Sequence, residues 1–379
     1  MVRFGRWGMS GVAFTLLVGG SLSGVATPAM ARATTVYKIG VDNAGPAGHN
    51  FEYVDYFPRS GVKVHRGDVL DFNWNTASVD GAHTATLVPA GAAVPGLFAP
   101  DADDGAQALQ FNPAVLAPSD PSCGNASTNP CVYDGTKLLN SGFIPNAVGG
   151  DFFVRVNPPA SGDSTVVNFV CEVHAGMKGS VTVVPDRREA SEQEDVREKA
   201  ADQLERDTRG ALRAEDAVDE SSVKLNSDGK THTVTVTAGT ATPFVEVAEM
   251  LPKKANIRPG DTVNWVTKTI QDPHTVTFPR GHGSDGVDPL PAFCEGVSDK
   301  PAVAPTDCAS PADFEVHLVP QPIGGTIISS PSTVATAGII GNPAAGLSNH
   351  FAFSFPNAGT FEYQCRIHDH MVGEIVART

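Results

Sequence analysis

The segments VVNFVCEVHAGM (166–177) and TFEYQCRIHDHM (360–371) decide the interpretation of this sequence. Each begins with residues that alternate between apolar and polar, as in a strand, and each ends in the pattern Cys-x-x-His-x-x-Met. The residues in this pattern are Cys171, His174 and Met177 and, in the second segment, Cys365, His368 and Met371. A thiolate, an imidazole and a thioether form a soft ligand set that suits copper as it cycles between Cu(I) and Cu(II).

Upstream of each loop, a segment that contains Trp is followed nine positions later by His. The matched residues are Trp74 and His83 in the first copy, and Trp265 and His274 in the second. The surrounding sequences are also alike, with GDVLDFNW before GAHTATL and GDTVNW before DPHTVTF. Such matched copies indicate an internal duplication. Because blue-copper geometry needs a second imidazole, we predict that the two upstream histidines complete the ligand sets, with each Met as a long axial ligand.

The copper loops, the GDTVNW-type strand and the upstream His resemble the cupredoxin family, which includes plastocyanin, azurin and amicyanin. The resemblance implies that each copy is a Greek-key β-sandwich, and the alternation in 231–237, 351–355 and 360–364 favours the same all-β class. It also implies that His174 and His368 reach the surface through an apolar patch and serve as the electron port. We therefore expect an electron-transfer protein with two coppers per chain, one type 1 (blue) site in each domain.

One position departs from the family pattern. Family members often carry Asn after the upstream His, where it ties the two copper loops together, whereas this sequence has Thr84 and Thr275. We expect the two hydroxyl groups to make the contact that the amide makes in the family.

Other functions fit these motifs less well. Zinc accepts the same nitrogen and sulfur ligands, but Met is a poor zinc ligand. Two-domain multicopper oxidases need several His-x-His pairs, and this sequence has one, at 368–370. Copper nitrite reductases place a His directly before the copper Cys, where this chain has Val170 and Gln364. We therefore predict a carrier rather than an enzyme. An extracytoplasmic copper handling or delivery protein is the main alternative, and a two-domain copper oxidoreductase is a weaker one.

The composition and the first residues bear on location and partners. The net charge of −15 excludes nucleic acid as a partner, because its phosphates would repel the chain. Residues 1–33 predict a signal peptide, with Arg3 and Arg6 before a short apolar stretch and cleavage near Ala31 or Ala33. A membrane anchor needs about twenty apolar residues, and this stretch is shorter. We expect a secreted protein with no transmembrane segment in the mature chain.

Residues 34–184 and 231–379 are predicted to form the two cupredoxin-like domains, and 185–230 a charged linker. The linker contains EQEDVREKAADQLERDTRGALRAED, whose helix formers and close opposite charges favour a helix. Its recurring apolar positions are Val196, Leu204 and Leu212. Because so few apolar residues offer little to bury, we interpret this segment as a mobile, partly helical linker. A helix docked on one sandwich, fixing the relative orientation of the domains, is the alternative.

The four cysteines outside the copper loops form two local pairs. These pairs are Cys123 with Cys131, and Cys294 with Cys308. Because an exported protein meets an oxidising environment, we predict two disulfides, with a second thiolate metal site as the alternative. This pairing leaves Cys171 and Cys365 free to bind copper.

The expected partners are redox proteins that exchange single electrons with the two sites, and the acidic composition favours basic ones. His370, which lies between His368 and Met371, is expected beside the second copper, where it would tune the potential or partner docking. The other histidines outside the ligand sets are interpreted as ordinary surface or core residues.

Overall fold

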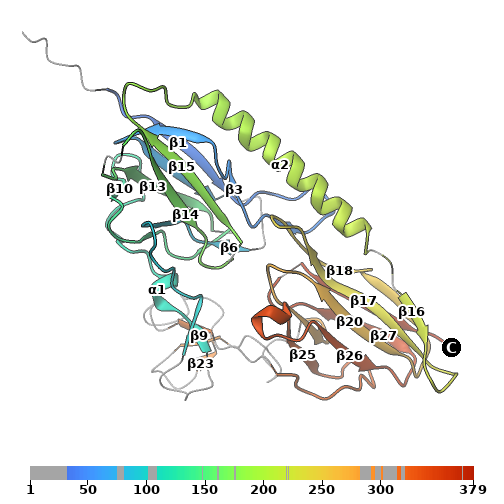
Figure 1. Cartoon of the computed structure of the whole chain (residues 1–379). Coiled ribbons are helices and arrows are strands. Elements are labelled where there is room, and N and C mark those ends of the chain that lie inside the picture. The colour runs from blue at the N-terminus through green and yellow to red at the C-terminus, as the bar shows by residue number, and fades with distance from the viewer. Residues whose placement is uncertain are drawn as a thin grey trace, which may run out of the picture. The chain divides into compact units, whose positions relative to one another are not determined.

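Strands make up most of the regular structure in this computed structural model (Figure 1). The structure describes residues 32–74, 81–100, 109–146, 148–159, 162–174, 176–218, 220, 222–281, 292–294, 300–301, 314–316, 321–368 and 370–379. The predicted signal peptide therefore lies almost wholly outside the described residues. Thr34–Thr379 form one compact unit.

The first sandwich consists of two five-stranded sheets. One sheet has the order β10 (Cys131–Tyr133), β13 (Gly150–Val156), β5 (Val69–Trp74), β1 (Val36–Val41) and β3 (Tyr56–Phe57). The other has the order β11 (Leu139–Asn140), β7 (Thr86–Val88), β14 (Thr165–Val170), β15 (Lys178–Val184) and β4 (Val62–His65). Alternate residues of these strands point inward, and Tyr56, Phe72 and Phe169 meet edge to face in the core.

The second sandwich also consists of two sheets. One has the order β2 (Phe51–Glu52), β18 (Glu246–Leu251), β17 (His232–Ala241), β20 (Thr262–Lys268) and β26 (His350–Ser354), with β16 (Ser222–Leu225) also paired to β17. The other has the order β19 (Lys254–Ile257), β28 (Val372–Ala377), β27 (Gly359–Gln364), β21 (His274–Phe278) and β25 (Ala335–Ile340). Its core is built around Trp265, which packs against Phe278 and Phe353.

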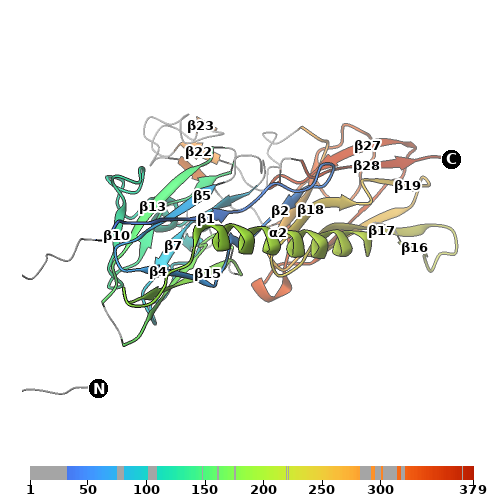
Figure 2. The same cartoon turned by 90° about the horizontal axis from the view of Figure 1, so that it is seen from above.

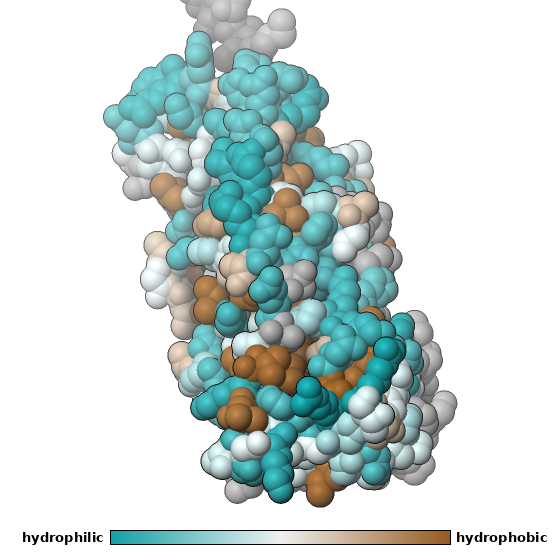
Figure 3. Space-filling model, turned by 90° about the vertical axis from the view of Figure 1, so that its right-hand side faces the viewer, coloured by the Kyte–Doolittle hydropathy of each residue, from teal (hydrophilic) through white to brown (hydrophobic). Residues whose placement is uncertain are grey.

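The remaining elements are short. They are the ladders of β6 (Ala82–His83) with β12 (Ile144–Pro145), of β8 (Phe98–Pro100) with β9 (Leu109–Phe111), and of β22 (Ala292–Cys294) with β23 (Lys300–Pro301) and β24 (Phe314–Val316), together with α1 (Pro113–Leu116) and the 3-10 helix Pro343–Ala345. Among the described residues, no helix is both long and apolar enough to cross a membrane. The face drawn in Figure 3 is largely hydrophilic, with smaller hydrophobic groups between the polar ones.

The two sandwiches repeat one strand order, as the internal duplication predicts. β1 runs parallel to β5, and β17 runs parallel to β20 in the same place. β14 pairs antiparallel with β15 in the first sandwich, and β27 pairs antiparallel with β28 in the second. The predicted fold class, all-β with two cupredoxin-like sandwiches, is confirmed.

A strand from the first half of the chain completes a sheet of the second sandwich. β2 pairs antiparallel with β18, and in that register Glu52 lies directly opposite Glu246. A separate apolar cluster, which includes Phe51, Tyr53 and Val247, surrounds this pairing. The two sandwiches are therefore joined by backbone hydrogen bonds and by a core of their own, which the sequence did not lead us to expect.

The charged segment between the sandwiches forms one long helix, α2 (Gln193–Asp216), which packs on β1, β3, β17 and β18 (Figure 2). The interpretation of this segment as a mobile linker is therefore wrong, and the docked helix is what forms. The three apolar positions noted in the sequence, Val196, Leu204 and Leu212, pack against the apolar clusters, and polar groups add to the contact. Buried Gln203 donates from its side-chain nitrogen to Asp55 Oδ2 (2.7 Å) and to the carbonyl oxygen of Tyr56 (2.8 Å).

Arg59 lies at the centre of this contact between helix and sheet. Its guanidinium group is 2.6 Å from Asp207 on α2 and 2.9 Å from Asp55, and both carboxylates are buried. The same group stacks over the ring of Phe244, 3.4 Å from the ring centroid. Arg59 thus ties the first sandwich, the helix and the second sandwich together.

One predicted disulfide is confirmed, because Cys123 and Cys131 are bonded, with Cα atoms 4.9 Å apart. The predicted partner of Cys294, Cys308, lies outside the described residues, so that disulfide stays a prediction. Cys171 and Cys365 are buried free thiols, as expected of residues reserved for a metal.

We predict that Arg59→Ala lowers the free energy of unfolding by about 3 kcal/mol, because it leaves two buried carboxylates without their cation. Urea unfolding of the metal-free protein measures this change. Arg197→Ala is the matched control, since Arg197 and Glu194 form an exposed pair on the same helix that should contribute about 0.5 kcal/mol or less. Equal stabilities of the two variants would contradict the role given to Arg59.

Candidate metal centres

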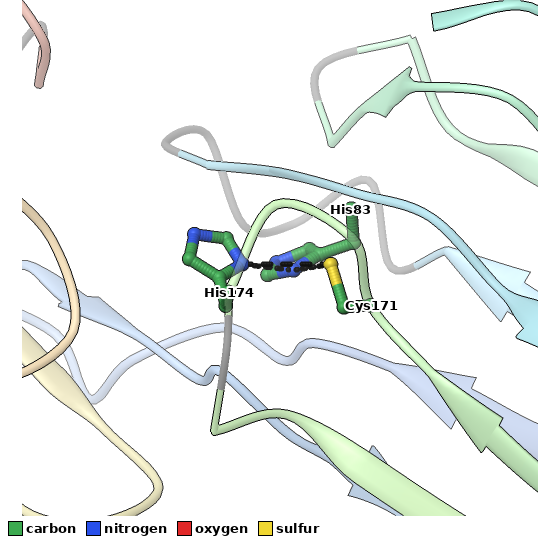
Figure 4. A group of neighbouring side chains, drawn as sticks. All are labelled: His83, Cys171 and His174. Carbon is green, nitrogen blue, oxygen red and sulfur yellow. Dashed lines mark hydrogen bonds between the residues drawn. The ribbon is translucent and has the colours of Figure 1, made fainter. Parts of the chain in front are cut away.

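His83, Cys171 and His174 converge at one end of the first sandwich (Figure 4). His83 is in β6, Cys171 directly follows β14, and His174 lies in the loop before β15. The Nδ1 atoms of the two imidazoles are 3.1 Å apart, and they lie 3.9 Å and 3.7 Å from the sulfur. All three side chains are almost completely buried. The structure thus brings together three of the four predicted ligands with their donor atoms facing a common point.

The second sandwich repeats this arrangement with His274, Cys365 and His368. The Nδ1 atoms of the two histidines are 3.2 Å apart, and Cys365 Sγ lies 3.6 Å from His368 Nδ1. His274 begins β21, and Cys365 directly follows β27. The matching distances show that the duplication preserves the geometry of the site as well as the strand order.

The backbone closes each loop in the same way. Cys171 N–H donates to the carbonyl oxygen of Met177 (2.9 Å), and Met177 N–H donates to that of His174 (3.0 Å). In the second loop, Cys365 N–H donates to the Met371 oxygen (2.8 Å). Both Met side chains are buried in the same apolar clusters as the cysteines. Each loop is therefore a tight turn that keeps the thiol, imidazole and thioether residues in one place.

Thr84 and Thr275 tie the upstream segments to the loops, as predicted. Thr84 Oγ1 accepts a hydrogen bond from Glu172 N–H, and Thr275 Oγ1 accepts one from Arg366 N–H, both at 2.8 Å. Their backbone N–H groups also point at the sulfurs of Cys171 (3.3 Å) and Cys365 (3.4 Å). Donors aimed at a sulfur stabilise its thiolate form.

The thiols are poised to ionise. Burial raises the pKa of Cys171, but hydrogen bonds and charge from His174 and His83 outweigh burial and bring it well below its usual value. The pKa of Cys365 is also lowered well below its usual value, because His274 and His368 oppose burial in the same way. The thiolate is the form that binds metals, so the neighbouring histidines favour the state of each sulfur that a metal needs.

Each imidazole turns its outer nitrogen, Nε2, toward a buried carboxylate. The pairs are His83 with Asp42 (3.3 Å), His274 with Glu246 (3.1 Å), His174 with Asp272 (3.1 Å) and His368 with Glu52 (3.6 Å). A carboxylate at Nε2 keeps a ring proton there when a metal replaces the proton on Nδ1. The carboxylates thus select the tautomer that both sites need.

These contacts also shift the pKa values of the imidazoles. Burial lowers the pKa of His83, but hydrogen bonds to Asp42 and Cys171 more than reverse this and raise it to about 9. For His174 the opposing effect comes chiefly from Asp272, and its pKa rises well above the usual value. Burial raises the pKa of Asp272, yet the charge of His174 outweighs burial and lowers it. Asp272 is therefore ionised beside its histidine.

The expected electron port is not at the surface. The family resemblance implied that His174 and His368 reach solvent through an apolar patch, but each is only 3% exposed. The outer nitrogen of His174 faces Asp272 of the second sandwich, and that of His368 faces Glu52 at the end of β2, the strand that joins the two sandwiches. His370, by contrast, is exposed at the end of its loop.

The four carboxylates were missed by sequence reasoning, although a signal was present. Glu52 and Glu246 stand in the strongly apolar segments FEYVDYF and VEVAEM, where an acidic residue needs a buried partner. Asp272 lies two positions before a predicted ligand, His274, at the place that Gly81 takes in the first copy. Such residues are candidates for contacts with metal-binding histidines.

Comparisons with known proteins give structural likenesses only. No protein-family model matches the chain, and no curated protein matches it. Among solved structures, amicyanin from Paracoccus versutus (Thiobacillus versutus) is 16% identical, with a TM-score of 0.20, and the match covers 42% of this chain and 92% of that chain. Auracyanin A, a "blue" copper protein from Chloroflexus aurantiacus, is 12% identical, with a TM-score of 0.22 and coverage of 41% and 100%.

We predict that Thr84→Val lowers the free energy of unfolding by about 1–3 kcal/mol, because Glu172 N–H loses its buried acceptor. Thr84→Ser, which keeps the hydroxyl, should stay close to the parent protein. Denaturant unfolding of both variants tests this, and a destabilisation by Thr84→Ser as large as that by Thr84→Val would contradict the role of the hydroxyl.

Proposed function

We propose that this protein binds two copper ions, one in each sandwich, and carries single electrons. The observation that carries the proposal is the pair of buried Cys-His-His clusters, each with both Nδ1 atoms and a sulfur aimed at one point. We assign as ligands the eight residues that the sequence predicts: His83, Cys171, His174, Met177, His274, Cys365, His368 and Met371.

The donor sets fit the group that they would hold. The sulfur and the two Nδ1 atoms of the first site lie between 3.1 Å and 3.9 Å from one another, close enough to bind a single ion. The observed separation between Cys171 Sγ and His174 Nδ1 is 3.7 Å, and that between Cys365 Sγ and His368 Nδ1 is 3.6 Å. A trigonal set of two imidazoles and one thiolate, with a nearby Met, is the donor chemistry of blue copper.

The bound copper would supply a one-electron couple between Cu(I) and Cu(II). The residues of the chain would support this couple by keeping the ligands in the same positions in both oxidation states. The backbone hydrogen bonds of the loops fix the ligands, and the Thr hydroxyls bind the upstream segments to the loops. All eight proposed ligands are buried, which supports a site that keeps water and substrates away from the ion. A carrier therefore suits this arrangement better than a catalyst, and better than a delivery protein that must release its metal.

The setting of this function is also part of the proposal. The segment predicted as a signal peptide and the bonded Cys123–Cys131 pair favour an extracytoplasmic protein. Because the net charge is −15, we propose redox partners that present a basic surface.

We predict that Cys171→Ser abolishes the thiolate-to-copper absorption of the first site and leaves that of the second, and that Cys365→Ser does the reverse. A serine hydroxyl cannot replace the thiolate whose charge transfer gives the colour. Visible spectra at equal protein concentration, together with copper content, check this. If both bands survive in either variant, the ligand assignment is wrong.

A further inference from the structure

The two clusters are joined by one buried carboxylate. Glu52 Oε1 lies 3.4 Å from His174 Nε2 in the first sandwich, and Glu52 Oε2 lies 3.6 Å from His368 Nε2 in the second. Glu52 is 1% exposed. A single side chain thus spans the gap between the outer nitrogens of imidazoles from the two sites.

A second carboxylate, that of Asp272, also connects the two sandwiches at this place. Asp272 belongs to the second sandwich, but its Oδ1 lies 3.1 Å from His174 Nε2 in the first. His174 of the first sandwich is therefore contacted by two carboxylates, Asp272 and Glu52, that the second sandwich and its added strand β2 provide. Gly81 stands at the position that matches Asp272, and any side chain there would collide with the carboxylate of Glu52.

The backbone fixes Glu52 at this place. It ends the short strand β2, which pairs with β18 and so belongs to the sheet of the second sandwich. The cluster around Phe51, Tyr53 and Val247 buries the same junction. The strand pairing and the apolar cluster therefore fix the position of Glu52 relative to His174 and His368.

We propose that Glu52, with Asp272, couples the two metal sites into one pair that exchanges an electron within the chain. This inference rests on the proposed copper function. In the exchange one site is oxidised from Cu(I) to Cu(II) as the other is reduced from Cu(II) to Cu(I), and no bond or proton has to move. External electrons come from the redox partner. Because electron tunnelling falls steeply with distance, two imidazoles that flank one carboxylate form a short connection between the clusters.

Electrostatics gives this arrangement a distinctive signature. A buried negative charge stabilises the more positive, oxidised form of a nearby site and so lowers its reduction potential. Asp42 touches an imidazole of the first site only, and Glu246 touches an imidazole of the second site only. Glu52, by contrast, faces both sites: its Oε1 lies 3.4 Å from His174 and 3.7 Å from His83, and its Oε2 lies 3.6 Å from His368. Glu52 should therefore act on both potentials, and the other two carboxylates on one each.

The first experiment measures these potentials one site at a time. The variant Glu52→Gln keeps the size of the side chain and removes its charge. It is made in two backgrounds: Cys365→Ser, in which only the first site is blue, and Cys171→Ser, in which only the second site is blue. We expect an upward shift of the midpoint potential in both backgrounds. Asp42→Asn should shift only the first site, and Glu246→Gln only the second. A shift of one site or of neither with Glu52→Gln would overturn the proposal.

The second experiment measures electron exchange and leaves Glu52 intact. Met371→Gln changes the axial ligand and so separates the spectrum and potential of the second site from those of the first. Pulse radiolysis with less than one electron per chain then reduces both sites out of equilibrium. We expect them to equilibrate at a rate independent of protein concentration. A rate proportional to concentration, or no equilibration, would overturn the proposal.

These outcomes are separate from a failure of the copper function. If the parent single-site proteins lack blue bands before any reduction, the proposed function fails. If the bands are present and the sites do not share Glu52 or an electron, only the coupling fails.

Discussion

The need of four buried histidines for an acceptor at their outer nitrogens governs the architecture of this protein. An imidazole that offers Nδ1 to a metal carries its proton on Nε2, and a buried N–H without a partner costs stability. Asp42 and Glu246 meet this need within their own sandwiches. Glu52 and Asp272 meet it across the junction, so the geometry of each site depends on the other sandwich.

The junction explains why other parts of the chain take the form they do. β2 leaves the first sandwich to pair with β18, and α2 lies over both with Arg59 and Gln203 at its contacts. These elements hold the loop ends together, and as a result they close the surface through which His174 and His368 were expected to reach solvent. His174 and His368 therefore face the carboxylates between the two sites and not solvent.

Sequence reasoning predicted what depends on local pattern. Short segments were enough to recognise the Cys-x-x-His-x-x-Met loops, the His nine positions after Trp and the Thr that follows this His. The structure brings these Cys and His residues together, and the Thr hydroxyls contact the loops. Other features depend on contacts between the two copies. These are the packing of α2, the pairing of β2 with a strand of the second sandwich, and the positions of the Glu52 and Asp272 carboxylates. Such contacts leave no period in the sequence. The helix α2 was misjudged because its few apolar residues, among them Val196 and Leu204, do pack on the cores, and buried polar groups add to that contact.

The most direct test of the account is a titration of the metal-free mature protein with copper, followed by visible absorption before and after ascorbate. The two Cys-His-His clusters predict an intense blue band that grows until two coppers are bound per chain, bleaches on reduction and returns on reoxidation. Copper that binds without colour, or a band that saturates at any other number of ions, would contradict the claim that both clusters are thiolate copper sites.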